Sequence, residues 1–234
     1  MHLKRCTVAR HRFPGEDLYP FNLRVLRSGE AIDFDTPVTF FVGENGSGKS
    51  TLLRAIARSC GIHIWEDLER ARTSRNPHEE QLHLYLEAEW VNEPVPGSFF
   101  SADRFRAFSQ SVDEWAIEDP AVLEIYGGKS LLVQSHGQSH MSFFTHRFRI
   151  RGLYLLDEPE NALSPKTQVA LRRELEGFTR SGEAQFIVAT HSPILLSLLG
   201  ARILDFDGDA PRPIAYADTE HYRIYKSFFE ARGQ

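Results

Sequence analysis

Short apolar runs and polar stretches alternate along the 234-residue chain, as in proteins that combine strands with helices. Residues 38–42 form an unbroken β-branched and aromatic run, which predicts a buried central strand. Residues 153–156 and 185–189 repeat this pattern later in the chain. The stretch between them carries apolar residues at helical spacing, and Ser164 is placed as a helix cap. A strand, a helix and a strand in this order predict an α/β fold with a mainly parallel core sheet.

The start of the chain has a different pattern, in which turn residues separate short mixed segments. Candidate strands lie at residues 3–11, 21–27 and 31–34. Together they predict an antiparallel β lobe at the edge of the fold, over residues 1–37. Residues 72–80 are polar and contain an Asn-Pro pair, so we expect a surface connection there.

The later segments are shorter and more polar. Residues 98–102 form a weaker strand candidate, and we expect a small helical region over about 98–150. Short strands are predicted at 202–206 and 213–216, and a closing helix at 219–231.

A glycine-rich segment follows the first buried strand and leads into a predicted helix at residues 52–59. It matches the Walker A pattern at every fixed position, in the strand-to-helix context that this motif requires. The glycines let backbone N–H groups turn inward around phosphates, and the helix N-terminus adds positive potential. The candidate phosphate-binding residues are Gly43, Asn45, Gly46, Ser47, Gly48, Lys49, Ser50 and Thr51. The alternative is a glycine-rich turn without a ligand. A second Gly-Lys-Ser ending, at residues 127–130, lacks the earlier glycine and a buried strand, so we interpret it as a turn.

Each polar side chain of the motif has an expected role. Lys49 should reach the β- and γ-phosphates, Ser50 should bind Mg²⁺, and Thr51 should contact the α-phosphate. Two acids, Asp157 and Glu158, follow the apolar run at 153–156, as in a Walker B motif. Asp157 would hold Mg²⁺ through water, and Glu158 would act as the general base. The alternative for this pair is two solvated acids at a strand end.

Further motifs make the resemblance specific. His191 ends the next apolar strand and should reach the same sheet edge as Asp157, although a lone histidine there is usually structural. Walker A, a Ser-His-Gly-Gln segment at 135–138, a Leu-Asp-Glu-Pro-Glu-Asn-Ala-Leu segment at 156–163 and Thr-His-Ser-Pro at 190–193 occur in this order. The chain thereby resembles an ABC-ATPase head. It is similar to small stand-alone ATPases near the recombination-type and SMC-type heads rather than to transporters.

The resemblance implies a site shared by two subunits. In such families the signature segment of one subunit closes over the γ-phosphate that the other holds, and the helix after the signature points its N-terminus at the nucleotide. It implies trans-acting roles for Ser135, Gly137 and Gln138, a D-loop at Asn161 and Ala162, and an H-loop at His191 that senses the γ-phosphate.

The chain departs from the family pattern at two points. His136 stands where the signature more often has glycine, so a bulky imidazole occupies a position in the expected trans contact. No glutamine is placed for a Q-loop, and Asp103, after the strand candidate at 98–102, is a substitute near Mg²⁺ or else an exposed turn acid. His136 and His140 are spaced to share a helix face, but no third zinc ligand is close in sequence.

Composition limits the choice of function. The chain is 41% hydrophobic and 25% charged, so we expect one globular domain over residues 1–234. Its net charge of -5 gives no overall attraction to nucleic acid, although a local basic groove is compatible with it. No apolar stretch approaches the roughly 20 residues that span a bilayer, and no secretory signal is visible, so we expect a cytoplasmic protein.

Three functions stay open at this point. The first is an enzyme that binds and hydrolyses ATP with Mg²⁺ and forms a head-to-head homodimer with ATP, as a switch on an unidentified effector protein or nucleic acid. The second is the motor subunit of an ABC transporter, which would need a membrane partner and usually has an aromatic stacking residue ahead of Walker A, a place for which Tyr19 and Phe21 are the candidates. The third is a nucleotide-binding regulator without significant turnover. A long-armed chromosome machine is excluded, because the segment between Ser50 and Ser135 is too short for a coiled-coil arm.

Overall fold

The main sheet of the protein is mixed but mostly parallel. The computed structural model describes residues 1–65, 76–180 and 182–233. Six strands follow the order β5-β6-β7-β3-β8-β9, and among the described strands of this sheet β9 alone runs antiparallel to its neighbour. These strands are β3 (Val38–Val42), β5 (Gly97–Ser101), β6 (Gly152–Asp157), β7 (Ala184–Ala189), β8 (Arg202–Asp205) and β9 (Arg212–Pro213). The predicted parallel core sheet is confirmed.

A second, antiparallel sheet lies at the N-terminal side. β1 (Leu3–Val8) pairs with β2 (Ile32–Asp33) and with β4 (Leu86–Trp90). The predicted antiparallel lobe is therefore present, but it takes one strand from beyond residue 37. Residues 72–75 of the predicted surface connection lie outside the described residues.

The strand predicted at residues 21–27 is wrong. That segment contains a 3-10 helix, Arg24–Leu26, in place of a strand. Phe21, Val25 and Leu26 are buried in the apolar core, so the apolar spacing reflects the packing of an irregular segment. Hydrophobic burial fixes this segment without a partner strand.

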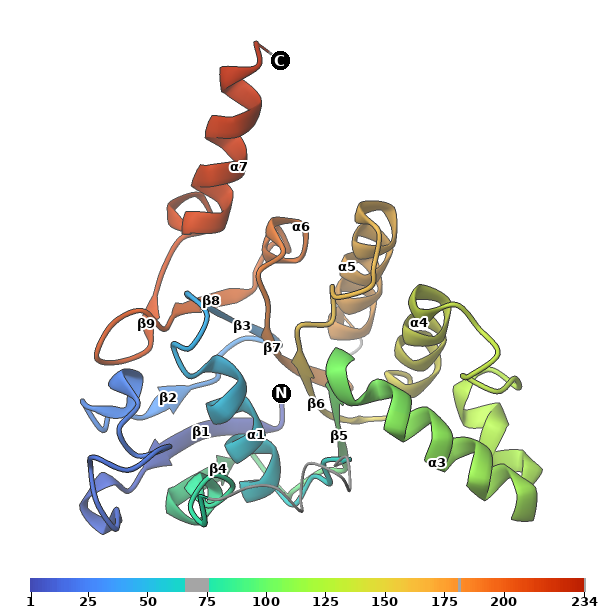
Figure 1. Ribbon diagram of the computed structural model, residues 1–234, viewed down its shortest axis with the longest axis horizontal. Helices are drawn as coiled ribbons and strands as arrows, with labels where there is room; N and C mark the ends of the chain where they lie inside the picture. The colour runs from blue at the N-terminus through green and yellow to red at the C-terminus, as the bar shows by residue number, and fades with distance from the viewer. Residues whose placement is uncertain (66–75, 181, 234) are drawn as a thin grey trace.

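Helices cover both faces of the main sheet (Figure 1). On one face α1 (Lys49–Ser59) packs between the main sheet and the antiparallel sheet, with Leu52 and Leu53 fully buried. The opposite face carries α3 (Phe105–Glu118), α4 (His136–Arg147), α5 (Pro165–Arg180) and α6 (Pro193–Leu196). Because successive strand residues point to opposite faces, Phe41 packs with α1 whereas Phe40 packs with the other helices.

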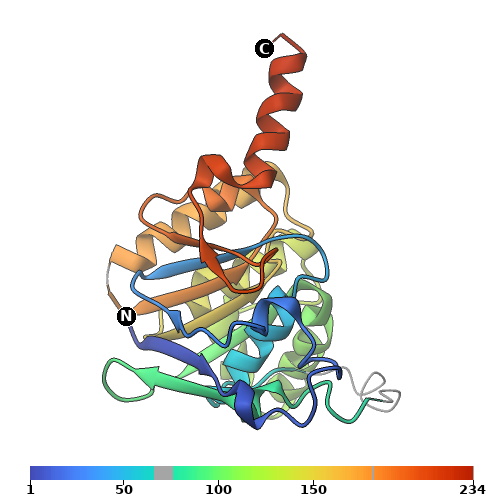
Figure 2. The same cartoon turned by 90° about the vertical axis from the view of Figure 1, so that its left-hand side faces the viewer.

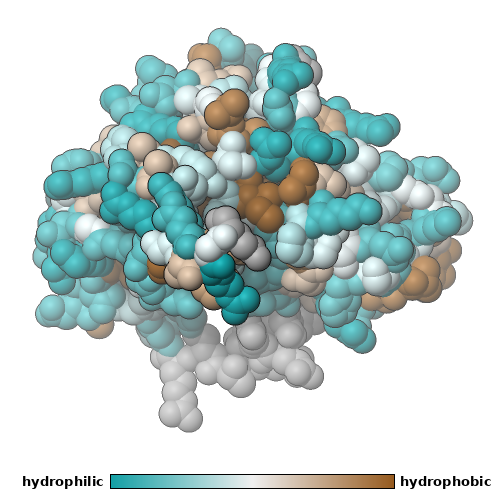
Figure 3. Space-filling model, turned by 90° about the horizontal axis from the view of Figure 1, so that it is seen from above, coloured by the Kyte–Doolittle hydropathy of each residue, from teal (hydrophilic) through white to brown (hydrophobic). Residues whose placement is uncertain are grey.

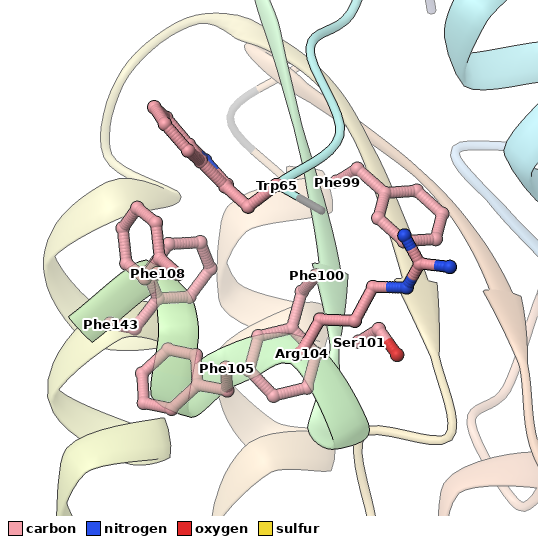
Figure 4. Close-up of a pocket in the computed structure, with 8 residues that line it drawn as sticks. All are labelled: Trp65, Phe99, Phe100, Ser101, Arg104, Phe105, Phe108 and Phe143. Atoms are coloured by element: carbon pink, nitrogen blue, oxygen red, sulfur yellow. The ribbon is translucent and has the colours of Figure 1, made fainter. Parts of the chain in front are cut away.

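The region after β5 is tied together by aromatic side chains. Phe100 of β5 lies 5.2 Å from Phe105 and 5.6 Å from Phe143 between ring centroids, and Figure 4 shows these rings gathered between the strand and the helices. Between Phe100 and Phe105 a short 3-10 helix carries Asp103 and Arg104. Aromatic packing on both sides therefore fixes the turn at the carboxyl end of β5.

The last helix projects from the body of the protein. α7 (Glu220–Ala231) extends away from the remaining layers in two perpendicular views (Figures 1 and 2), and none of its residues is buried. It starts within one residue of the predicted closing helix. Among the residues that the structure describes, none of the helices combines the length and the apolar character needed to cross a bilayer.

Candidate active site

The glycine-rich loop connects the end of β3 to the start of α1, as the sequence predicts. Gly48, the N-cap residue of α1, has φ 102°, and a Cβ atom there would lie 3.2 Å from the Leu23 side chain. Gly43 has φ 138°, and a Cβ atom there would lie 2.8 Å from Oδ1 of Asp207. Both positions require glycine because of backbone conformation and of space. The loop borders a cavity of about 140 Å³, lined by Tyr19, Leu23, Asn45, Gly46, Gly48, Lys49, Ser50, Thr51 and Glu158.

Lys49 is folded back over its own loop. Its Nζ donates hydrogen bonds to the carbonyl oxygens of Gly43 at 2.7 Å and Glu44 at 2.9 Å. Burial lowers the pKa of Lys49, whereas nearby carboxylates, Asp207 foremost, act to raise it. The ammonium group of Lys49 therefore rests on carbonyl oxygens that carry partial negative charge. Phosphate oxygens are able to replace these carbonyl oxygens as its hydrogen-bond acceptors.

The proposed magnesium ligands lie next to each other. Ser50 Oγ donates a 2.7 Å hydrogen bond to Oδ1 of Asp157, at the carboxyl end of β6. Burial raises the pKa of Asp157, and the Arg54 guanidinium opposes this shift. A hydroxyl beside one carboxylate suits Mg²⁺, which prefers oxygen ligands and completes its shell with water and phosphate. Within the described residues no group of three or more His, Cys, Asp or Glu side chains is arranged to hold a metal.

Asp103 lies at the same edge of the sheet. It lines a cavity of about 110 Å³ together with Ser50, Arg54, Asp157, Glu158 and Asn161. Its side chain is exposed and makes no direct bond to Ser50 among the described contacts. Asp103 is thus both a turn acid and a neighbour of the candidate metal site.

Glu158 and His191 face each other across the sheet edge. Glu158 has φ 49°, and its Oε2 accepts a 2.7 Å hydrogen bond from Nδ2 of Asn161. Nε2 of His191 lies 3.8 Å from Oε1 of Glu158 and, among the described residues, has no hydrogen-bond partner. Burial, followed by the Lys49 charge, lowers the pKa of His191. An imidazole with a lowered pKa thus lies beside an oriented carboxylate that lines the phosphate-loop cavity.

The signature segment begins α4 and lies apart from this loop. Gln138 Oε1 accepts hydrogen bonds from the Ser135 backbone N–H at 3.1 Å and from Ser135 Oγ at 2.9 Å. A Cβ atom on Gly137 would lie 3.3 Å from the Ala162 carbonyl oxygen, so this glycine packs against the D-loop. Ser135, His136 and Gln138 are exposed. None of the four signature residues lines the phosphate-loop cavity described above.

Two family models match separate parts of the chain. Residues 20–85, which contain the glycine-rich loop, match a family model described as "AAA domain". Residues 129–197, which contain the signature, Asp157, Glu158 and His191, match one described as "AAA domain, putative AbiEii toxin, Type IV TA system". The chain has the sequence motifs and the fold of an ABC-type P-loop ATPase domain.

Curated relatives and a solved structure agree with this assignment. The ATPase domain is 28% identical over 240 residues to the Fe(3+) ions import ATP-binding protein FbpC 2 of Rhizobium meliloti, covering 97% of this chain and 59% of that protein. It is 27% identical over 199 residues to the sn-glycerol-3-phosphate import ATP-binding protein UgpC of Escherichia coli, covering 81% and 55%. The chain thus spans somewhat more than half of the curated relatives that it matches. Its fold resembles that of cbiO1 from Clostridium perfringens, part of the ABC transporter complex cbiONQ, with a TM-score of 0.54, 16% identity and coverage of 86% of this chain and 87% of that one.

The structure corrects one proposed role and adds detail to another. Phe21 is 4% exposed and packs on Phe13 and Tyr85, so it cannot stack on a nucleotide base. Tyr19 lies at the phosphate-loop cavity, and its hydroxyl shares a 2.8 Å hydrogen bond with Oγ1 of Thr51. Tyr19 therefore stays available beside the loop of this ATPase domain.

Two contacts of the ATPase domain escaped the sequence analysis. Oδ1 of Asp207 accepts a 2.7 Å hydrogen bond from the backbone N–H of Glu44 and so fixes the loop. Acidic residues at the end of β8 were the available signal in the sequence. Because the parallel strands β3 and β8 end at the same sheet edge, an acid after β8 lies close to the loop after β3. The second is His221, whose Nε2 lies 2.8 Å from Nδ1 of His191. No local pattern connects these two histidines.

Proposed function

We propose that this domain binds Mg-ATP and hydrolyses it in a site that a second copy of the domain completes. The observation that carries the proposal is the orientation of Glu158. Its carboxylate is held by Asn161 at 2.7 Å, faces His191 at 3.8 Å and borders the same cavity as Lys49. A fixed carboxylate beside a phosphate loop is what activation of a water molecule requires.

Each of these residues has a distinct part in the proposed reaction. Lys49 and the loop N–H groups compensate the phosphate charge, and Glu158 accepts a proton from the attacking water. His191 offers an N–H to the γ-phosphate. Ser50 and Asp157 would hold Mg²⁺, which supplies positive charge to the phosphate oxygens.

The position of the signature supports a site shared between two copies. Ser135 and Gln138 are exposed at the N-terminus of α4, where backbone N–H groups suit an anion. They do not line the phosphate-loop cavity of their own chain. ATP would then join two domains face to face, and hydrolysis would separate them.

Replacement of Glu158 by Gln tests the reaction. We expect the variant to bind Mg-ATP as the wild type does and to turn over at least about a hundredfold more slowly, because the amide cannot accept the proton. Unchanged turnover would assign the base to another group. Tight ATP binding with no turnover in the wild type would instead establish a nucleotide-binding regulator.

A second candidate exists for the process that ATP hydrolysis drives. Both curated relatives described above carry names of import ATP-binding proteins, which supports the motor subunit of an ABC transporter better than a switch on a soluble effector or nucleic acid. The position of Tyr19 beside the loop is compatible with a base-stacking role in either case. Purification of Glu158→Gln with ATP from a whole-cell lysate treated with detergent separates the two. A membrane protein in stoichiometric amount supports the transporter, and recovery with a soluble protein or nucleic acid supports the switch.

A further inference from the structure

The side chain of His191 is held by a second histidine from the C-terminal helix. Nδ1 of His191 lies 2.8 Å from Nε2 of His221, and the ring centroids are 5.0 Å apart. His191 is thus held on two sides, because its backbone N–H also donates a 2.6 Å hydrogen bond to Oε1 of Glu160. The contact with His221 occupies the ring nitrogen that faces away from Glu158.

The start of α7 is anchored so that His221 has a fixed place. Thr219 is buried, and its Oγ1 donates a 2.7 Å hydrogen bond to the Tyr216 carbonyl oxygen. The Tyr216 hydroxyl donates at 3.1 Å to the carbonyl oxygen of Pro193, two residues after His191. The segment before α7 is therefore bound to the same chain turn that carries His191.

Beyond this anchored first turn, α7 has little other attachment. Its outer part exposes apolar side chains, and Figure 3 shows this end of the molecule with apolar residues among polar ones. These exposed side chains are Ile224, Tyr225, Phe228 and Phe229. Since packing of the outer turns does not explain the location of the helix start, the contacts of residues 216–221 determine it.

We propose that His221 is a positioning residue, which fixes the ring orientation and the tautomer of His191 by donating its Nε2–H to Nδ1. This inference rests on the proposed function of His191 at the γ-phosphate. A neutral imidazole carries one proton, so a hydrogen bond accepted at Nδ1 places the proton of His191 on Nε2. That nitrogen is the one 3.8 Å from Glu158, and it is buried without a hydrogen-bond partner among the described residues.

Burial and the charges of Lys49 and His221 lower the pKa of His191, whereas Glu158 and Glu44 act to raise it. Lys49, Glu158, Glu44 and His221 are the charged or titratable groups that act on it, and burial is the largest cause of its lowered pKa. A neutral ring has two tautomers, only one of which directs an N–H toward the phosphate side. A partner that selects the tautomer therefore acts on the reaction through His191.

Histidine NMR tests the proposal without any turnover. In the nucleotide-free protein labelled with ¹⁵N-histidine, the His191 signals are assigned from a His191→Gln variant. We expect the Nε2–H tautomer in the wild type and in His221→Gln, whose side-chain amide is able to donate in place of the ring. We expect a mixture of tautomers in His221→Ala. An Nδ1–H tautomer in the wild type, or an unchanged tautomer in His221→Ala, overturns the proposal.

Measurement of ATP turnover is the second test of the proposal. We expect His221→Ala to lower kcat about tenfold with little change in KM, in the range found when a positioning partner is removed, and His221→Gln to recover most of it. Ile224→Ala, on the next turn of the same exposed helix, should keep the wild-type kcat. Full activity in His221→Ala, or an equal loss in Ile224→Ala, contradicts the proposal. If the wild type selects the tautomer but does not hydrolyse ATP, the proposed function fails while the role of His221 stands.

Discussion

The hydroxyl of Ser50 donates a 2.7 Å hydrogen bond to Asp157, although the two residues are 107 positions apart in the chain. This bond joins the first turn of α1 to the carboxyl end of β6. It brings the two oxygen ligands expected for Mg²⁺ together before any ion binds. The candidate metal site is therefore a product of the parallel sheet, which ends β3 and β6 at one edge.

The first prediction concerns this pair. Ser50→Ala should raise the Mg²⁺ concentration needed for half-maximal turnover by about tenfold or more, because one hydroxyl ligand is lost and the orientation of Asp157 is weakened. Turnover measured against Mg²⁺ at saturating ATP checks this. Ser59→Ala, at the far end of α1, is the control, since its Oγ donates a hydrogen bond to the carbonyl oxygen of Ile56. An equal shift in both variants would count against a metal site at Ser50.

Lys49 and Lys129 provide a matched pair for the phosphate loop. Both follow a glycine and precede a serine, but only Lys49 lies in the cavity between β3 and α1, whereas Lys129 is exposed. We expect Lys49→Ala to abolish detectable ATP binding, because it removes the cation facing the β- and γ-phosphates. Lys129→Ala should bind ATP like the wild type. Isothermal titration calorimetry with ATP measures the affinity of both variants. Wild-type affinity in Lys49→Ala would disprove the assignment of the loop as a phosphate-binding loop.

The shared site is open to complementation. Lys49→Ala lacks the phosphate cation but keeps its signature, and Ser135→Arg keeps the phosphate loop but carries a bulky cation on the surface expected to face it. Each variant alone should be inactive, and mixing the two should restore turnover, since one composite site in the mixed dimer is intact.

Light scattering supplies the matching physical measurement. Glu158→Gln should form a stable dimer with Mg-ATP, and Glu158→Gln combined with Ser135→Arg should not, while its own ATP binding survives. If mixing restores nothing and the double variant still dimerises, the signature does not act between subunits.

His140 makes stability depend on pH. Burial lowers the pKa of His140 from 6.5 to about 4, with His136 as a further cause. Below pH 6.5 the unfolded chain binds a proton that the folded protein still excludes, so stability falls as the pH drops from 6.5 toward 4. Between pH 7 and pH 4.5 this one group should account for about 2.5 kcal/mol of lost stability.

His140→Phe is the variant that isolates this effect. The ring packs edge-on against Phe100 and Phe105, and its Nδ1 has no hydrogen-bond partner among the described residues, so a phenyl ring suits the site. Denaturant unfolding at both pH values should show a smaller loss in the variant than in the wild type. Parallel losses in the two proteins would show that His140 titrates normally.

The sequence predicts the parts of the fold that local patterns determine. Buried parallel strands are apolar on both faces, so β3, β6 and β7 are visible as unbroken runs, and turn chemistry then locates the phosphate loop. The segment at 21–27 misleads because Phe21, Val25 and Leu26 are buried from an irregular backbone. β4 alternates polar and apolar positions, as a strand with one buried face does. It pairs with β1, and no local sequence pattern identifies β1 as its partner.

Contacts between distant segments set the rest of the site. Asp207 reaches the loop because β8 lies beside β3, and His221 reaches His191 because Tyr216 fixes the chain before α7. Neither pairing has a characteristic spacing, so only the folded arrangement reveals it.

The hydrogen bonds that Lys49 makes to its own loop bear on how nucleotide enters. Because Nζ already holds the carbonyl oxygens of Gly43 and Glu44, and Asp207 holds the Glu44 N–H, the loop has its shape before a phosphate arrives. The conformational entropy of the loop is therefore lost when the domain folds, and not when the nucleotide binds. Arrival of the phosphates then exchanges one set of acceptors around Lys49 for another. The loop is preorganised, so the affinity of the domain for nucleotide depends on the quality of that exchange and little on ordering of the backbone.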